Sequence, residues 1–395
     1  MGLLRHNPGF RTLWIARSIS FLGDSIAVVA LLLHVQSTTG TAVAVALLLF
    51  VGDCVPGLLA PLTGAVADRA PLKTLLVSCE LVSGALVLAL ATLPPLPVMI
   101  ALAGALGVVS GIIGPAARRA VPLYVADAGL EGANAAIGVG TNGVEAIGPV
   151  VAGALLLVTD VPSLLVIDAV TFGVAAATLA TLPGVPAPAQ VSEPLLTGAR
   201  AGLRHLWATP LLRPVALGFV LVVACTGVDD VALVFLAKDE LSAGDSATAL
   251  LYAGVGIGLA VGYLLLVWLG GRVSPLTLFA AGLAISSAGN LLTGLAGVVA
   301  AALALQAVRG VGIAAIDVGL NTHVQREVPP SLQGRVFGNL YGGAGLAAGL
   351  SYLVGGWLLQ QTDARTVFVL AGAGGLVATI GTVLALHRNR RHRPE

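Results

Sequence analysis

Charged residues are scarce in this chain of 395 residues. Asp, Glu, Lys and Arg make up only 10% of the sequence, whereas 57% of it is apolar. Soluble domains carry about 25% charged residues, because a surface in contact with water needs them. The composition therefore excludes a soluble fold of this size. A formal net charge of +1, with the basic residues spread over separate loops, also argues against a nucleic-acid-binding surface.

Cysteine and histidine do not form the clusters that a metal site or a disulfide framework requires. Cys54, Cys79 and Cys225 all fall within apolar runs, where cysteine acts as a small apolar residue. The 6 histidines show no ligand spacing, and no glycine-rich phosphate loop of the Gly-Lys-Ser/Thr type occurs. No nucleophile-and-base pair stands out either. We therefore expect no metal, no cofactor and no enzyme activity.

Long apolar runs are what the sequence does contain. Each is about 20 residues long, which is the length of a helix that crosses a bilayer, and short polar breaks separate them. We predict twelve membrane-spanning helices and, between the sixth and seventh, a surface helix at Leu195–Trp207. The predicted spans cover residues 12–35, 42–66, 75–93, 98–117, 133–158, 163–182, 211–236, 247–269, 276–295, 298–323, 332–359 and 367–386.

An internal repeat divides the chain into two halves. The charged segment Gly64–Lys73 has a near copy at Gly271–Leu278, and both contain a Gly, an Arg and a Pro-Leu pair in the same order. The segment Gly148–Gly153 matches Ser351–Gly356, and these segments start 203 residues apart, which is also the separation of Arg69 and Arg272 in the first pair. The repeat predicts an all-α membrane protein with two pseudo-symmetric six-helix bundles.

The predicted domains are residues 1–183 and 211–395, joined by a linker at 184–210. If the N-terminus is cytoplasmic, all but four of the 20 Lys and Arg residues fall on the cytoplasmic side, as the positive-inside rule requires. The four exceptions are Arg17, Lys238, Arg309 and Arg365. We expect a multi-pass protein of the inner (cytoplasmic) membrane, surrounded by lipid, with both termini in the cytoplasm.

The loop after the second predicted span carries a resemblance to a known family. Gly64-x-x-x-Asp68-Arg69-x-x-x-Lys73 resembles the loop signature of the major facilitator superfamily. Span number, half-chain repeat and central linker fit that family, so the resemblance covers essentially the whole chain. It implies the major facilitator fold and transport by alternating access between two six-helix bundles.

Two further motifs resemble one branch of this family. Gln325–Pro329 followed by Gln333–Val336 resembles the loop before helix 11 in bacterial drug exporters, a branch that includes macrolide and siderophore exporters. Gly148-Pro149-x-x-Ala152-Gly153 is similar to the antiporter motif Gly-Pro-x-x-Gly-Gly, from which it departs at Ala152. The resemblance therefore implies a drug:proton antiporter.

The charged loop is the predicted conformational gate. Gly64 allows close approach of a neighbouring helix, and Asp68 is expected to meet the positive N-terminus of helix 11. Arg69 and Lys73 can bind carboxylates or phosphate headgroups, or they can serve as topology determinants only. Arg272 is their counterpart in the second loop. Because Gly271 replaces Asp68 there, we expect the acidic function in one copy only.

Carboxylates inside the predicted spans are candidates for proton coupling. A charge in a bilayer costs several kcal/mol unless it faces protein or water. The candidates, of which we favour the first, are Asp24, Asp229, Asp230, Asp317 and Glu145. Each can instead be a structural carboxylate, paired with arginine or capped by serine. We expect less from Glu80 and Asp168, because the resemblance places their helices at the periphery.

A polar stripe on the tenth predicted span is expected to line a central cavity. Gln306, Arg309, Asp317 and Asn321 fall within about a third of the helix circumference. Arg309 and Arg17, which lies in the first span, are candidate partners of the carboxylates or substrate contacts.

These observations predict a secondary active transporter that acts as a monomer on protons and a small-molecule substrate. Its expected function is proton-coupled efflux of a small amphipathic organic compound, and hence multidrug resistance. One alternative is uptake, or dedicated export of one metabolite such as a siderophore. Another is a sensor or scaffold with a transporter-like fold that transports nothing. The charges within the spans favour transport, because a scaffold has little need of them.

Overall fold

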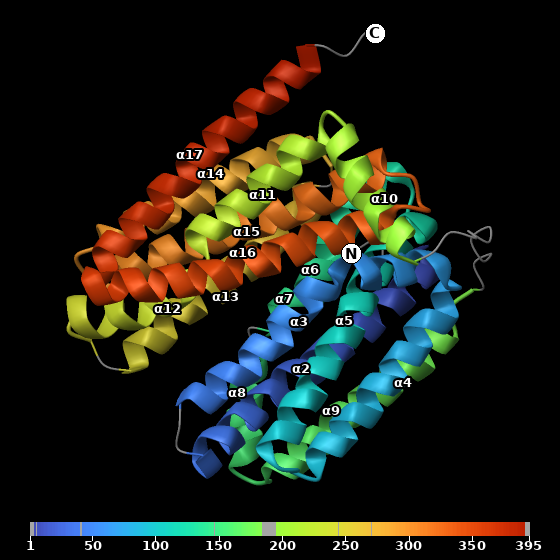
Figure 1. Ribbon diagram of the computed structural model, residues 1–395, viewed down its shortest axis with the longest axis horizontal. Coiled ribbons are helices and arrows are strands. Elements are labelled where there is room, and N and C mark those ends of the chain that lie inside the picture. The colour runs from blue at the N-terminus through green and yellow to red at the C-terminus, as the bar shows by residue number, and fades with distance from the viewer. Residues whose placement is uncertain are drawn as a thin grey trace. The chain divides into compact units, whose positions relative to one another are not determined.

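The computed structural model shows helices as the only regular elements among the residues it describes (Figure 1). These residues are 4, 6–39, 42–145, 147–183, 195–243, 245–269 and 271–391. The all-α class expected from the apolar runs is thus confirmed.

The helices follow the order of the predicted spans. Those before residue 184 are α2 (Pro8–Thr39), α3 (Ala42–Arg69), α4 (Leu72–Ala91), α5 (Leu96–Tyr124), the short η1 (Asp127–Gly129), α6 (Leu130–Gly140), α7 (Asn142–Glu145), α8 (Gly148–Leu156) and α9 (Val161–Ala180). Those after it are α10 (Leu195–Ala208), α11 (Leu212–Thr226), α12 (Asp229–Phe235), the π-helix η2 (Leu236–Glu240), α13 (Asp245–Leu269), α14 (Pro275–Gly294), α15 (Val299–Glu327), α16 (Gln333–Gln361) and α17 (Ala364–Arg391).

Ten helices in the described part of the chain are long and apolar enough to cross a membrane, or eleven if the bent pair α10–α11 is one span. The ten helices match ten of the twelve predicted spans. The helix expected at 195–207 is present as α10. The remaining two predicted spans, 133–158 and 211–236, are each divided into shorter helices.

Glycine and proline explain both interruptions. The span predicted at 133–158 is divided into α6, α7 and α8, and α8 begins at Gly148-Pro149. Proline has no N–H to donate and its ring collides with the carbonyl four residues earlier, so a helix starts again at this point. The span predicted at 211–236 is divided at Gly227-Val228, directly before α12.

The chain forms two compact units, and each contains a segment from the other sequence half. Unit 1 comprises Met1–Asp127, Gly140–Leu203 and Val328–Gly342, and unit 2 comprises Ala128–Val139, Arg204–Glu327 and Gly343–Glu395. The first part of α16 therefore belongs to unit 1, and nearly all of α6 belongs to unit 2. The domain division at residues 183 and 210 stays a prediction.

The same helix pairs pack in both units. In unit 1, α3 packs on α5, α4 packs on α5 and α9, and α2 packs on α9. In unit 2 the equivalent pairs are α13 on α15, α14 on α15 and α17, and α11 on α17. The internal repeat seen in the sequence is thus also a repeat in helix packing.

Equivalent N-caps begin the last helix of each repeat. Oδ1 of Asp160 accepts from the Ser163 amide (3.0 Å) at α9, and Oδ1 of Asp363 accepts from the Thr366 amide (2.7 Å) at α17. The Ser163 hydroxyl and amide lower the pKa of Asp160, and the Thr366 amide lowers the pKa of Asp363. Each cap therefore stabilises its helix near neutral pH, and this contribution is lost as the pH falls through the lowered pKa.

Glycines bring α13 and α15 into backbone contact inside unit 2. A Cβ on Gly262 would lie 2.9 Å from Cα of Val311, and one on Gly258 would overlap the backbone of Ala307. The Gly258-x-x-x-Gly262 pair thus packs within a unit. Gly349, by contrast, has no atom within 4 Å of an added Cβ.

We expect Gly258→Leu to destabilise the protein strongly, because the larger side chain cannot enter the α13–α15 contact. Overpacking of this kind costs about 1–3 kcal/mol or more. The matched substitution Gly349→Leu should leave the melting temperature unchanged or slightly higher. Thermal unfolding of both variants in detergent checks this, and equal melting temperatures would show that α13 and α15 do not touch as described.

Candidate functional site

The carboxylate of Asp68, at the end of α3, binds the first turn of α16 within unit 1. Oδ1 accepts a hydrogen bond from the Gly334 amide (2.7 Å), and Oδ2 accepts one from the Arg335 amide (2.9 Å). Asp68 is only 3% exposed. The first amides of a helix lack intrahelical partners and carry partial positive charge, so they stabilise this anion. The structure therefore places Asp68 at the helix end where the sequence suggested it.

Small residues let α3 and α16 approach closely enough for this contact. A Cβ on Gly64 would lie 2.5 Å from the carbonyl oxygen of Gly334, and one on Gly338 would lie 2.5 Å from that of Ala60. Gly342 also packs against Ala60. Any larger side chain at these positions would push the backbones apart and lengthen the bonds to Asp68.

The basic residues of the predicted gate lie in two different units. In unit 1, Arg69 and Lys73 are half-buried. Arg119 of α5, which the sequence did not single out, donates from Nη1 to the carbonyl of Ala67 and so supports the end of α3. Arg272 belongs to unit 2, where its guanidinium carbon lies 5.7 Å from the centre of the Trp268 ring.

Unit 2 contains a second carboxylate contact, which the sequence reading missed. Glu131, at the start of α6, is 3% exposed and binds Arg326 at the end of α15 through two contacts, of 2.8 and 3.1 Å. Nearby, the Asn134 amide donates to Thr322 Oγ1 (2.9 Å) and Gln325 Oε1 (2.6 Å). The start of α6 is thus bonded to the end of α15.

The carboxylate lies on the loop in the unit 1 contact and at the helix start in the unit 2 contact. In unit 1 the acid is on the loop, as Asp68, and the helix start contributes only amides. In unit 2 the loop has Gly271 with φ +79°, and a Cβ there would lie 3.3 Å from Oε2 of Glu131. The loop of unit 2 thus has no acid of its own, and the carboxylate beside it is that of Glu131 of α6. The expectation of an acidic function in one copy only stays a prediction.

Asp24 and Asp168 line one cavity of about 400 Å³ inside unit 1. Asp24 is on α2, and Asp168 is on α9 and only 1% exposed. Thr171 donates to Oδ1 of Asp168 (3.2 Å), whereas Oδ2 has no hydrogen-bond partner among the described residues. Apart from these two acids, Ser110 is the one polar side chain among the lining residues. The structure thus brings a preferred candidate together with a residue of which less was expected.

Glu80 is neutralised by its own partners near this cavity. Its Oε1 accepts from Nη1 of Arg17 (3.1 Å), and its Oε2 accepts from the Ser20 hydroxyl (3.1 Å). Glu80 and Arg17 are both buried. Arg17 is therefore a carboxylate partner in this conformation, one of the two roles considered for it.

Arg309 and Gln306 belong to a buried polar network of unit 2. Arg309 forms an ion pair with Asp229 of α12 and donates to Gln306 Oε1 (3.1 Å). Gln306 in turn donates to Thr293 Oγ1 (3.2 Å), and Asn290 donates to Asp229 (3.4 Å). Gln306 has no exposed surface. In this conformation the network is internal to the bundle, which favours a structural role for Asp229.

Asp317 and Asn321, the two stripe residues nearer the C-terminal end of α15, form a separate small cluster. Asp317 is half-buried and accepts from the Tyr263 hydroxyl (3.2 Å) and from the Asn321 amide (2.8 Å). The four stripe residues therefore fall into two groups, one around Arg309 and one around Asp317.

The antiporter-like motif coincides with the start of α8. A Cβ on Gly148 would overlap Ser25 of α2, whereas Gly153 has open space around it. The side chains of Glu145, Pro149 and Asp230 lie outside the part of the chain that the structure describes, so their candidate roles stay predictions.

Comparison with known proteins decides the family. The model of the Major Facilitator Superfamily matches residues 13–239 and 230–395, nearly the whole chain. The chain belongs to the major facilitator superfamily. It is therefore a multi-pass membrane transporter and not an enzyme.

Several relatives of this transporter match along its whole length. An uncharacterized MFS-type transporter, YfiS of Bacillus subtilis, is 25% identical over 98% of this chain and 96% of its own. The enterobactin exporter EntS of Escherichia coli O1:K1 is 29% identical over 100% and 95%. A bacterial homologue of the iron transporter ferroportin, in an outward-facing state, has the same fold, with a TM-score of 0.79 and 17% identity over 96% of this chain and 99% of that one.

We expect Asp68→Asn to weaken the contact between the end of α3 and the start of α16. The amide has no charge for the helix N-terminus and keeps one acceptor instead of two, a loss of about 2 kcal/mol. Spin labels at Ala70 and Ser331 should report a broader, longer distance distribution by pulsed EPR. Lys73→Gln is the matched control and should give the wild-type distribution. An unchanged distribution in Asp68→Asn would contradict the assigned contact.

Exchanging the charges of Glu131 and Arg326 tests the unit 2 contact. Glu131→Arg alone should lower the free energy of unfolding by about 1–3 kcal/mol, because it places two cations together where a charged hydrogen-bonded pair stood. The double variant Glu131→Arg with Arg326→Glu should recover at least half of that loss in a denaturation experiment. Additive losses in a double-mutant cycle would mean that the two side chains do not interact.

Proposed function

We propose that this transporter exports a small amphipathic organic compound in exchange for protons. Its full-length similarity to an enterobactin exporter supports efflux. The observation that carries proton exchange is the pair of carboxylates, Asp24 and Asp168, in one cavity of unit 1. Export of several toxic compounds, and hence multidrug resistance, follows only if the substrate range is broad.

The proposed proton site rests on the charge balance of the cavity. Two carboxylates in an otherwise apolar cavity repel one another, so keeping both as anions is unfavourable. No basic residue is among the described residues that line the cavity, and Arg17 of α2 is bound to Glu80. A proton held by Asp24 and Asp168 removes one negative charge and gives the unpartnered Oδ2 of Asp168 a hydrogen to share.

Release of that proton is the proposed coupling step. When the cavity opens to water, the second carboxylate can ionise, because water screens the charge that the closed cavity does not. Proton binding thereby favours one state of α2 and α9 over the other. Exchange follows if substrate binds the state that has released its proton.

The carboxylate contacts at α16 and α6 are proposed to hold the transporter closed on the side of the charged loops. Asp68 joins the loop after α3 to α16, and Glu131 joins α6 to α15. In each contact a helix from one repeat is bonded to a segment of the other. Breaking both allows the loop side to open, as alternating access requires.

Dedicated export of one metabolite is the second candidate. The similarity to the enterobactin exporter over the whole chain favours a siderophore as that metabolite. A transport assay against a panel of antibiotics, dyes and siderophores separates the candidates, because a dedicated exporter accepts one class of compound only.

The proposal also covers the membrane in which the protein lies and its oligomeric state. The excess of basic residues in alternate loops supports both termini in the cytoplasm, and the bacterial relatives support the inner membrane. We propose that the monomer is the working unit.

We expect Asp24→Asn and Asp168→Asn each to abolish uptake into inside-out proteoliposomes driven by a pH gradient, while substrate binding is retained. Each amide keeps a polar group in the cavity but cannot bind and release the proton. Asp363→Asn, which can still cap α17, is the control and should transport at the wild-type rate. Full dependence on the pH gradient in either cavity variant would rule out the pair.

A second measurement detects proton binding directly and does not need a known substrate. Carbodiimide reagents label protonated carboxyl groups in apolar sites, and peptide mass spectrometry locates the label. We expect labelling at Asp24 or Asp168 that fades as the pH is raised, and no label above background on Asp363, whose pKa the Thr366 amide lowers. Equal labelling of all carboxylates would contradict a specific proton site.

A further inference from the structure

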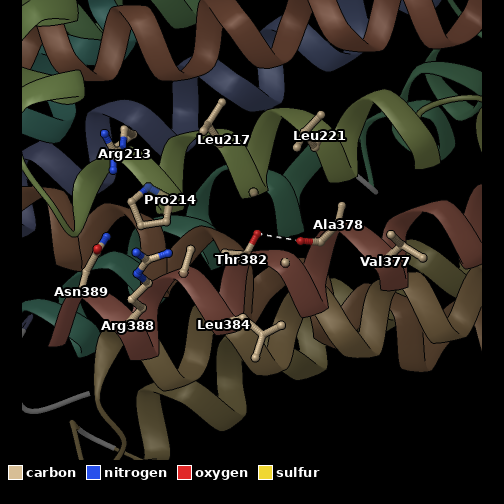
Figure 2. Close-up of a pocket in the computed structure, with 13 residues that line it drawn as sticks. Arg213, Pro214, Leu217, Leu221, Val377, Ala378, Thr382, Leu384, Arg388 and Asn389 are labelled. Carbon is tan, nitrogen blue, oxygen red and sulfur yellow. Dashed lines mark hydrogen bonds between the residues drawn. The ribbon is translucent and has the colours of Figure 1, made fainter. Parts of the chain in front are cut away.

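A groove of about 980 Å³ runs between α11 and α17 in unit 2 (Figure 2). Small residues leave it open, because they give the facing helix surfaces little bulk. Those that line it are Gly218, Ala378, Gly381, Thr382 and Ala385. The helices meet at Gly218, which packs directly against Thr382, whereas a Cβ on Gly381 would meet nothing within 4 Å.

The sides of the groove are apolar and strongly exposed. Val377 is 71% exposed and Leu384 is 65% exposed, and Leu217 and Leu221 contribute from α11. In a membrane protein this surface faces acyl chains rather than water. The lining therefore fits a hydrocarbon chain.

One end of the groove is basic. Figure 2 shows Arg213 and Arg388 together at this end, beside Asn389, with Leu221 and Val377 at the other. Both arginines are exposed, no acidic residue lines the groove, and neither guanidinium forms a hydrogen bond or ion pair within the described chain. The two groups present a fork of donors that matches a phosphate.

The length of the groove matches one leaflet of a bilayer. Arg388 follows Val377 by 11 positions on α17, which is a rise of about 16.5 Å at 1.5 Å per residue. Half of a hydrocarbon core of about 30 Å is about 15 Å. The arginines thus reach headgroup depth when Val377 lies near the middle of the membrane.

We propose that this groove binds one anionic glycerophospholipid. The phosphate binds Arg213 and Arg388, and one acyl chain lies along Gly218 and Gly381. By the orientation proposed above, the bound lipid belongs to the cytoplasmic leaflet, whose anionic lipids attract basic residues near the surface. The site is separate from the cavity of Asp24 and Asp168, and the occupant is a resident lipid rather than the transported compound.

The test is native mass spectrometry of the purified full-length protein titrated with phosphatidylglycerol and, separately, phosphatidylcholine of the same acyl chains. We expect phosphatidylglycerol to bind with clear preference. Arg213→Gln with Arg388→Gln should weaken its binding about 30-fold, because each arginine contributes about fivefold. Arg204→Gln, which removes an exposed arginine outside the groove, should bind as the wild type does.

A second variant tests the groove itself. Gly381→Leu fills the groove with both arginines in place, and its Cβ has room, so the fold should be kept and phosphatidylglycerol binding lost. Unchanged binding in either groove variant would overturn the proposal. So would displacement of the lipid by glycerol phosphate at equal concentration, because the site would then recognise a free phosphate and not a lipid.

Discussion

Neutralising charge inside an apolar bundle is the constraint on which the rest of this structure depends. Glu80 binds Arg17, Asp229 binds Arg309, and Asp68 binds the amides at the start of α16. Each arrangement places a counter-charge beside a group that lipid or protein cannot solvate. Asp168 is different, because its Oδ2 has no hydrogen-bond partner among the described residues and none of those that line its cavity is basic.

The two sequence repeats meet this constraint in different ways. Helix pairing is the same in both units, and Asp160 and Asp363 cap equivalent helices. Unit 1 has its acid, Asp68, at the end of α3, whereas unit 2 has Glu131 at the start of α6, where it binds Arg326 of α15. A charge interaction needs only a donor and an acceptor at the contact, so either partner can contribute the carboxylate.

Each interruption of a spanning helix occurs in one repeat only. The Gly148-Pro149 start of α8 lies on α2 near Ser25, whereas α16, in the other repeat, runs unbroken through the equivalent position. A break leaves backbone groups without helical partners, which a membrane protein tolerates only where protein or a cavity surrounds them. The break before α12 likewise comes next to Asp229 and its buried network.

The sequence by itself determined the solvent, the helical class, ten of the spans and the family, because apolar runs and charge distribution are local properties of the chain. It also identified Asp68, since its motif is contiguous, and the resemblance to a known family indicated the helix end that Asp68 binds. Only the tertiary structure decided that Asp168 shares a cavity with Asp24, and that Glu131 lies beside Gly271 and binds Arg326. These residues are far apart in the chain, and helix rotation and packing, which no local pattern encodes, set which side chains meet.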